Sequence, residues 1–186
     1  LTASEYRNVG EYRLVGGTEF RDGRVDWKST PYVDAWRFEQ DRGIQLRPGD
    51  VLITKDGTIG KVAYIQELPG PATLNSGVFV VRPLREAYDS HFFYFLLRSR
   101  VFEDFLLKLK AGSTISHLYQ RDLVGLVLDM PPSLREQRAI ASALADTDAE
   151  IDVLRSRLGK ARAIKVGMMQ ELLTGRTRLP VTEGVA

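Results

Sequence analysis

The residue types on which most enzymes rely are sparse in this chain. It contains no cysteine and only two histidines, His91 and His117. A thiolate metal site is therefore excluded, and a zinc site would need carboxylates in unusual number. The chain also lacks a Gly-x-x-x-x-Gly-Lys-Ser/Thr nucleotide loop and a Gly-x-Ser-x-Gly nucleophile elbow. The run from Gly57 to Lys61 resembles a phosphate loop only loosely, because its spacing is too short. We expect no catalytic residue, no metal and no cofactor.

Polar side chains on two loops are the residues best suited to chemistry with a nucleic acid. Exposed cations, hydroxyls and amides hydrogen-bond phosphate oxygens and the edges of bases. The first set is Lys55, Thr58 and Lys61, where Gly57 and Gly60 let the backbone approach closely. The second set lies in a polar segment further along the chain: Ser113, Thr114, Ser116, Tyr119, Gln120 and Arg121. Arg21, Arg24 and Lys28 form a third, weaker set.

Each of these residues also has a purely structural interpretation. Lys61 fits an exposed lysine at a strand end as well as it fits a DNA contact. Asn75 and Ser76 are more typical of a turn, and His117 of a structural hydrogen bond. Residues 1–132 carry 17 Lys/Arg and 17 Asp/Glu, so any basic face must arise from arrangement rather than from excess charge.

The elements that must position these loops are short strands and a helix. Four aliphatic runs bounded by Gly, Pro or Asp predict strands at 51–54, 59–65, 78–82 and 123–128. The first two form a plausible hairpin over residues 50–65, with its turn at Lys55-Asp56-Gly57. Aromatic and aliphatic residues at helical spacing predict one helix from about Ser90 to Lys110, with most of its rings buried. We expect an α+β fold for this part of the chain.

The run from Leu134 to Leu173 predicts one uninterrupted helix of 40 residues. Ser133 and Glu136 have the spacing of a capping box, and Gly175 is a natural residue just beyond the C-terminus. Apolar side chains recur in steps of three and four along a seam broken by Thr147 and Lys165. The pairing residues are Ile140, Leu144, Ile151, Leu154, Leu158, Met168 and Leu172. Because a lone helix of this length would expose its apolar stripe, the seam predicts a partner helix and a coiled coil.

These patterns divide the chain into a globular domain at 1–132, a long helix at 133–179 and a tail at 180–186. Arg155 to Arg178 carries seven basic residues against Glu171 alone, which is typical of a solvated coiled-coil flank. No stretch approaches the apolar length of a membrane span, and the N-terminus has no signal-peptide pattern. We expect a cytoplasmic protein, and the first residue, Leu1, indicates a fragment or an incomplete reading of a longer chain.

Five segments together resemble the specificity subunit of type I restriction–modification systems. They occur in that family's order and cover nearly the whole chain. The segments are Met130-Pro-Pro-Ser-Leu-Arg-Glu-Gln-Arg-Ala-Ile140, the helix end at 161–179, the Gly-Asp…Gly-x-x-Gly-Lys hairpin at 46–63, and the runs at 74–83 and 112–118. Each segment alone is weak evidence for the family, whereas five segments in the same order are strong evidence.

The resemblance implies a DNA-binding adaptor without a reaction of its own. Residues 1–132 would be a target-recognition domain that reads one half of a bipartite double-stranded DNA sequence. The long helix would be a spacer that packs antiparallel against a second such helix. Methyltransferase subunits and restriction (motor) subunits would dock on this scaffold. The family usually carries two domains and two helices, so the chain is expected to be a half subunit, which pairs with itself or another half, or part of a longer chain.

Two other interpretations stay open. The chain could be a protein–protein assembly module, a degenerate half subunit that retains the helix but does not bind DNA. It could also be a methyltransferase fragment, although Asp129-Met-Pro-Pro132 lacks the aromatic residue that would clamp a flipped base. Salt-dependent binding to duplex DNA separates the first interpretation from the adaptor, and binding of S-adenosylmethionine would support the second.

Overall fold

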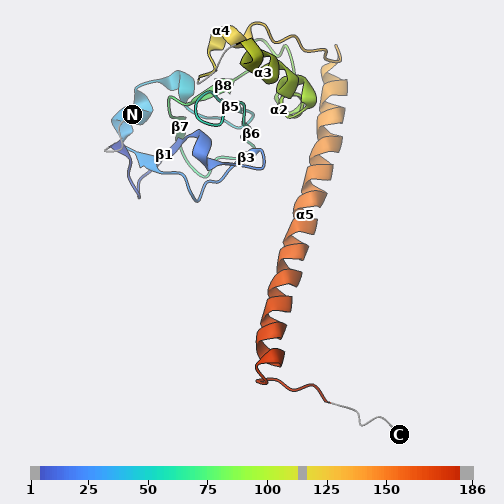
Figure 1. Ribbon diagram of the computed structural model, residues 1–186. Coiled ribbons are helices and arrows are strands. Elements are labelled where there is room, and N and C mark those ends of the chain that lie inside the picture. The colour runs from blue at the N-terminus through green and yellow to red at the C-terminus, as the bar shows by residue number, and fades with distance from the viewer. Residues whose placement is uncertain (1–4, 113–116, 181–186) are drawn as a thin grey trace. The chain divides into compact units, whose positions relative to one another are not determined.

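The computed structural model describes residues 5–112 and 117–180 (Figure 1). Contacts within the chain divide it into two units, residues 1–141 and 142–186. Among the described residues, the first unit contains all the strands and the helices α1 to α4, and the second contains most of the long helix α5 (Leu134–Leu173). The expected α+β class, with a long C-terminal helix, is confirmed.

One antiparallel sheet carries the predicted hairpin. Its central strand is β5 (Val51–Thr54), which pairs with β6 (Val62–Tyr64) on one side and β8 (Val78–Val81) on the other. All four residues of β5 are buried, as expected for a strand covered on both faces. The predicted strand at 59–65 is shorter than expected, because residues 55–61 form the turn.

A salt bridge joins the beginning of β5 to the end of β8. Arg82 follows β8, and its Nε lies 2.6 Å from the Asp50 carboxylate, whose side chain is only 4% exposed. A second guanidinium nitrogen donates to the other Asp50 oxygen at 2.7 Å. These hydrogen bonds raise the pKa of the Arg82 guanidinium above its ordinary value. The pair fixes the end of β5 that lies opposite the hairpin turn.

A second sheet, which the sequence patterns did not predict, packs beside the first. Its order is β4 (Tyr32–Val33), β1 (Tyr12–Val15), β7 (Ala72–Leu74), and β1 runs parallel to β7. The remaining pair is a small hairpin of β2 (Phe20–Arg21) and β3 (Arg24–Val25). Three short helical turns complete this region: η2 (Gly17–Glu19), α1 (Ala35–Glu39) and η3 (Arg42–Ile44).

The predicted helix over residues 90–110 is two helices, α2 (Ser90–Leu97) and α3 (Arg100–Gly112). The prediction of a single helix is therefore wrong. Asp89 caps α2 by accepting a hydrogen bond from the Phe92 amide at 2.9 Å. The Ser99 hydroxyl donates to the Leu96 carbonyl at 2.7 Å, and this local bond accompanies the break. Hydrophobic periodicity continues across the break, because both helices bury rings in the same core cluster.

The predicted strand over residues 123–128 is also wrong. A short helix, α4 (Gln120–Leu123), is followed by turn hydrogen bonds, with the Leu126 amide donating to the Leu123 carbonyl at 3.1 Å. Val124 and Val127 are more than 80% exposed, whereas Leu126 packs against the core. Exposed and buried side chains thus alternate along the segment as in a strand. The segment is nevertheless not a strand, because no described strand lies where it could pair with its backbone.

The long helix α5 has the predicted bounds, Leu134–Leu173. The Glu136 amide lies 3.5 Å from the Ser133 hydroxyl at one end, and Gly175 has a φ of 72° at the other. Within the first unit, the buried side chain of Gln137 accepts from the Asp89 amide at 2.8 Å and donates to the Pro131 carbonyl at 2.7 Å. Figure 1 shows α5 continuing without a break over its whole length. None of the helices in the described part of the chain is apolar enough to cross a membrane.

Candidate nucleic-acid interface

The hairpin turn that carries the first predicted set is built on a buried threonine. The Thr54 hydroxyl donates to the Thr58 carbonyl at 2.5 Å and accepts from the Lys61 amide at 2.9 Å. Thr54 is 1% exposed, so these bonds tie the turn to the core. Gly60 has a φ of 86°, and a side chain there would collide with Leu106. The turn is therefore held in one shape, with Thr58 and Lys61 exposed on it.

The segment that carries the second predicted set docks directly onto this turn. The Leu118 amide donates to the Lys55 carbonyl at 2.9 Å, and His117 forms a β-bridge with Asp56. The His117 Nδ1 also contacts the Asp56 carboxylate. Leu118 is fully buried in the core cluster. Two loops that lie about 60 residues apart in the sequence thus form one surface, held by a main-chain hydrogen bond and the contact between the side chains of His117 and Asp56.

Two aromatic rings and one guanidinium cluster at the exposed end of this segment. The centroids of the His117 and Tyr119 rings are 4.5 Å apart, and the Arg121 guanidinium lies 4.5 Å from the centroid of Tyr119. The Tyr119 amide donates to the Asp122 carboxylate at 2.8 Å, which fixes the start of α4. Tyr119 is 48% exposed and the Arg121 side chain 79% exposed. An exposed aromatic ring with an arginine on its face can stack on a base or bind a phosphate.

A pocket of about 270 Å³ adjoins the turn. Its wall comes from η2, the end of β5, the hairpin turn and the β7–β8 loop: Gly17, Thr18, Thr54, Asp56, Gly57, Thr58, Lys61, Asn75 and Gly77. Three glycines leave backbone atoms accessible there, and the polar side chains offer both donors and acceptors. This lining suits an extended polar ligand such as a nucleic-acid backbone better than a small apolar molecule.

The cations of the first and third sets differ in their freedom to reach a ligand. The Lys55 ammonium lies 4.7 Å from the centroid of the Phe79 ring, so its position is fixed by a cation–π contact. Lys61 is exposed on the rim of the pocket. The Arg21 guanidinium donates to the Thr18 carbonyl at 2.7 Å, at the edge of the same pocket. The contacts that join the first two sets do not include Arg24 or Lys28.

Other predicted residues have structural roles or lie outside the described part of the chain. Ser113, Thr114 and Ser116 fall outside the described residues. Asn75 accepts a hydrogen bond from the Gly77 amide at 2.9 Å, which confirms the predicted turn. His117 makes the structural contact that its sequence interpretation favoured, and His91 stacks on Tyr64 with ring centroids 4.5 Å apart.

Sequence reasoning missed two contributors to this surface, Asp56 and Thr18. Asp56 was noted only as a turn residue, and no local signal could pair it with a histidine 61 positions away. Thr18 lies beside the hairpin turn in the pocket, and no local pattern in the sequence indicated this neighbourhood. Among the described residues, no group of three or more His, Asp or Glu side chains could hold a metal ion.

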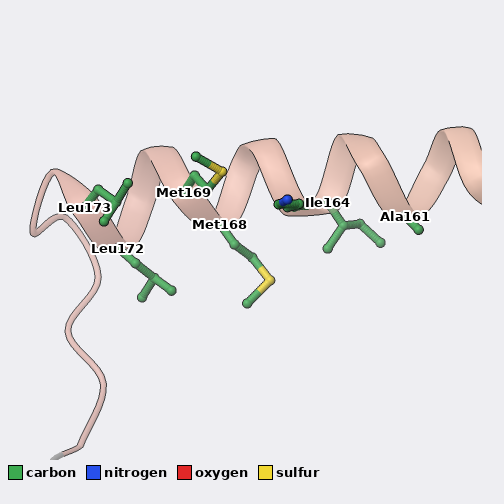
Figure 2. Close-up of a pocket in the computed structure, with 7 residues that line it drawn as sticks. Ala161, Ile164, Met168, Met169, Leu172 and Leu173 are labelled. Carbon is green, nitrogen blue, oxygen red and sulfur yellow. The ribbon is translucent and has the colours of Figure 1, made fainter.

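The predicted pairing residues of α5 are mostly exposed. Leu144 is 42% exposed, Leu154 53% and Leu158 50%, and no described residue after Ala141 is buried. In the last three turns the apolar face widens, because Ile164 and Met169 lie beside the seam. Figure 2 shows the side chains of Ile164, Met168 and Leu172 pointing to the same side of the helix. Apolar side chains are thus exposed along much of α5, and pairing through them stays a prediction.

A protein-family model, the type I restriction modification DNA specificity domain, matches residues 1–160. The chain belongs to this family. The putative type I restriction enzyme MjaX specificity subunit of Methanocaldococcus jannaschii is 27% identical over 178 residues, which are 94% of this chain and 42% of the relative. The Escherichia coli EcoBI specificity subunit is 30% identical over 141 residues, 72% of this chain and 28% of the relative. The chain thus spans less than half the length of these curated relatives.

Solved structures show the same fold. The HsdS subunit from Thermoanaerobacter tengcongensis matches with a TM-score of 0.63 and 19% identity, over 96% of this chain and 47% of the other. The S subunit from M. genitalium matches with a TM-score of 0.61 and 16% identity, over 92% and 40%. The family relation and the fold therefore agree, and the resemblance found in the sequence is confirmed.

Proposed function

We propose that residues 1–132 read one half of a bipartite duplex DNA target for a type I restriction–modification complex. In this proposal residues 133–179 form the spacer helix, which pairs with a second such helix and carries methyltransferase and restriction subunits, and residues 180–186 are a tail. The chain itself supplies recognition and no chemistry. The restriction–modification relatives support this role, and a solved chain with a TM-score of 0.62 comes from work on complex assembly of the type I system.

The observation that carries the proposal is the joining of the two predicted polar loops into one exposed surface. A DNA-binding face needs cations for phosphates and neutral polar groups for base edges in the same place. Lys61 and Arg121 are the exposed cations of this surface, and Thr58 and Gln120 are its exposed neutral groups. Because the net charge of residues 1–132 is balanced, this local grouping is what would attract a polyanion.

The turn and the His117 segment are rigid enough to act as a reader. Leu118 and Thr54 are buried, and the main-chain hydrogen bond from the Leu118 amide to the Lys55 carbonyl, which joins the loops, is 2.9 Å long. A reader of base edges must hold its side chains in a fixed relation, because hydrogen bonds lose most of their strength when they are bent or stretched. We infer that the target sequence depends on Thr58, Gln120 and their neighbours, whereas Lys61 and Arg121 contribute affinity for any sequence.

The test is binding of duplex DNA over a series of salt concentrations. Lys61→Ala and Arg121→Ala should each weaken binding about three- to tenfold and reduce the salt slope by about 0.9, the value for one lost phosphate contact. Arg47→Ala is the matched control, because Arg47 is exposed but lies before the beginning of β5, near the Asp50–Arg82 pair. Its affinity for DNA should stay unchanged.

A second candidate function is favoured by the exposed face of α5. A chain that binds only protein partners would still need this helix, and it would compete with intact subunits for methyltransferases. Such a chain would show no salt-dependent binding to duplex DNA. If Lys61→Ala and Arg121→Ala bound DNA as tightly as the wild type, the DNA-binding face would lie elsewhere in the domain.

A further inference from the structure

A buried carboxylate adjoins the pocket beside the hairpin turn, and none of the roles described above uses it. Glu19 ends η2 and is only 9% exposed. Its Oε2 accepts a hydrogen bond from the Gly16 amide at 2.8 Å, which caps the helical turn. Its Oε1 accepts from the Thr18 hydroxyl at 2.6 Å. Capping accounts for the bond to Gly16, but it does not account for the bond to Thr18.

The bond to Glu19 decides what Thr18 can offer to a ligand. An ionised carboxylate has only acceptors, so the Thr18 hydroxyl gives its single proton to Glu19. The lone pairs of the hydroxyl oxygen remain, and Thr18 is an exposed residue on the wall of the pocket. Towards a ligand, Thr18 is therefore an acceptor and not a donor.

Asn75, on the β7–β8 loop, has the opposite character. Its Oδ1 accepts from the Gly77 amide at 2.9 Å, and the two ends of the side-chain amide are thereby assigned, because a main-chain N–H can only donate. Its Nδ2 lies beside Gly16, where any side chain on that glycine would collide with it. No described residue accepts from Nδ2, and no buried side-chain nitrogen in the described part of the chain lacks a partner. Nδ2 is therefore open to the pocket, as a donor.

The main chain holds the donor and the acceptor in place. The Asn75 amide donates to the Val15 carbonyl at 2.9 Å, which continues the pairing of β7 with β1. Thr18 is fixed through Glu19, whose Oε2 lies 3.1 Å from the position that a Cβ on Gly16 would take, beside Asn75 Nδ2. One fixed donor and one fixed acceptor thus line a single pocket of about 270 Å³.

The charged groups of the pocket decide which part of a nucleic acid reaches these two residues. Asp56 lines the pocket, and its carboxylate and that of Glu19 would repel a phosphate. Lys61 is exposed on the rim, where a phosphate can meet it. The Thr54 hydroxyl is occupied by the Thr58 carbonyl and the Lys61 amide. The neutral edge of a base therefore fits inside the pocket, while the DNA backbone stays at its rim.

We propose that Asn75 and Thr18 read the major-groove edge of an adenine, and that Glu19 sets this preference as a positioning residue that does not touch DNA. Asn75 Nδ2 donates to N7 of the base, and the Thr18 hydroxyl oxygen accepts from the N6 amino group. In the major groove only adenine presents an acceptor beside a donor, whereas guanine presents two acceptors, cytosine one donor and thymine one acceptor. The inference rests on the proposed function and adds two specificity-determining residues and the base that they select.

Glu19→Gln tests the role of Glu19, because it changes no atom that touches DNA. The Gly16 amide still needs an acceptor, so the oxygen of the substituted side chain stays there and its nitrogen faces Thr18. The Thr18 hydroxyl then accepts from that nitrogen and turns its proton towards the pocket. Two donors match the N7 and O6 acceptors of guanine, so the preference at this one position should change from adenine to guanine, by about tenfold.

Thr18→Val separates the two contacts. It removes the acceptor but leaves the Asn75 donor, and N7 is common to adenine and guanine. The variant should therefore select both purines alike at the position where the wild type selects adenine. Because Thr18 is exposed, the core stays intact, and this variant decides the question if Glu19→Gln does not fold. Glu39→Gln is the matched control, since Glu39 is exposed at the end of α1, and it should select the wild-type sequence.

The measurement is selection by the full chain from a pool of randomised duplexes, followed by sequencing of the bound DNA. A change to guanine in Glu19→Gln and to either purine in Thr18→Val would support the inference. Selection of the same sequence by the wild type and both variants would overturn it and leave the proposed function intact. A wild type that shows no salt-dependent binding to duplex DNA would overturn both.

Discussion

The two units of this chain differ in the burial of their apolar side chains. In the first unit, Leu52, Ile53 and Leu74 are at most 1% exposed, and two core clusters account for its packing. In the second unit, Leu154 and Leu158 are about half exposed, and no described residue is buried. The first unit therefore has its own core, whereas the apolar side chains of α5 in the second unit stay largely exposed.

This difference separates the two roles of the chain. The first unit uses its core to hold loops, so its function depends on polar residues that the core positions. In the proposed function, the apolar residues of α5 are themselves the functional surface, and the helix would supply spacing of about 1.5 Å per residue. Substitutions in the first unit should thus act through folding or through DNA binding, and substitutions in α5 should act through association.

The largest expected effect compares the same substitution in the two units. Leu52→Ala should lower the free energy of unfolding by about 3 kcal/mol, because it removes buried methyl groups and leaves a cavity. Leu154→Ala should change it by less than about 0.5 kcal/mol, since its side chain is 53% exposed. Urea denaturation followed by tryptophan fluorescence measures the first unit alone, because Trp27 and Trp36 both lie in it. Similar losses in both variants would mean that α5 contributes to the stability of the first unit.

A charge in the seam should separate association from folding. Leu158→Asp places a carboxylate where we expect a partner helix, and desolvation of that charge should weaken association by about 100-fold. Light scattering should then report a mass near 20.9 kDa, while the fluorescence-detected unfolding curve stays that of the wild type. Lys160→Ala is the control, because Lys160 lies on the far face of the helix. Arg135→Asp is unsuitable as a control, because Arg135 lies in the first unit. Unchanged mass in Leu158→Asp would contradict the pairing seam.

Helix α5 could be predicted to the residue because its limits are local. Ser133 and Gly175 act within one turn of the ends they define, and the apolar repeat between them runs along the whole helix, broken at Thr147 and Lys165. The strands β5 and β8 were predicted for the same reason, since turn residues bound short aliphatic runs. The predictions that failed concern elements that depend on distant partners. Strand β1 pairs with β7 about 60 residues away. The segment around Leu126 has the alternating burial of a strand, but no described strand lies beside it.

The candidate interface shows the same limit. Its two loops could be named from their polar and glycine-rich composition, but their contact could not. The bond from the Leu118 amide to the Lys55 carbonyl and the pair between His117 and Asp56 exist because Leu118 is buried beside β5. The sequence signal that this segment turns back onto the domain was Leu118, an apolar residue that stands among polar ones.

The smallest expected effect concerns Asp56, and its sign is informative. If charge alone determined DNA affinity, Asp56→Asn would strengthen binding, because it removes a negative charge next to Lys55 and Lys61. If Asp56 instead acts by holding His117, and through it Tyr119 and Arg121, the same variant should weaken binding two- to fivefold or about 0.4–1 kcal/mol.

The measurement is the affinity for duplex DNA of the wild type, Asp56→Asn and Asp41→Asn. Asp41 is exposed and caps η3, before the beginning of β5, where it accepts from the Gly43 amide at 2.7 Å. Its substitution changes the net charge equally but leaves the His117 contact intact. Tighter binding by Asp56→Asn would show that the two loops act as independent charges. Weaker binding in Asp56→Asn alone would show that the domain recognises DNA through the fixed relation between its loops. Such a fixed relation needs the rigid core of the first unit, which the exposed helix lacks.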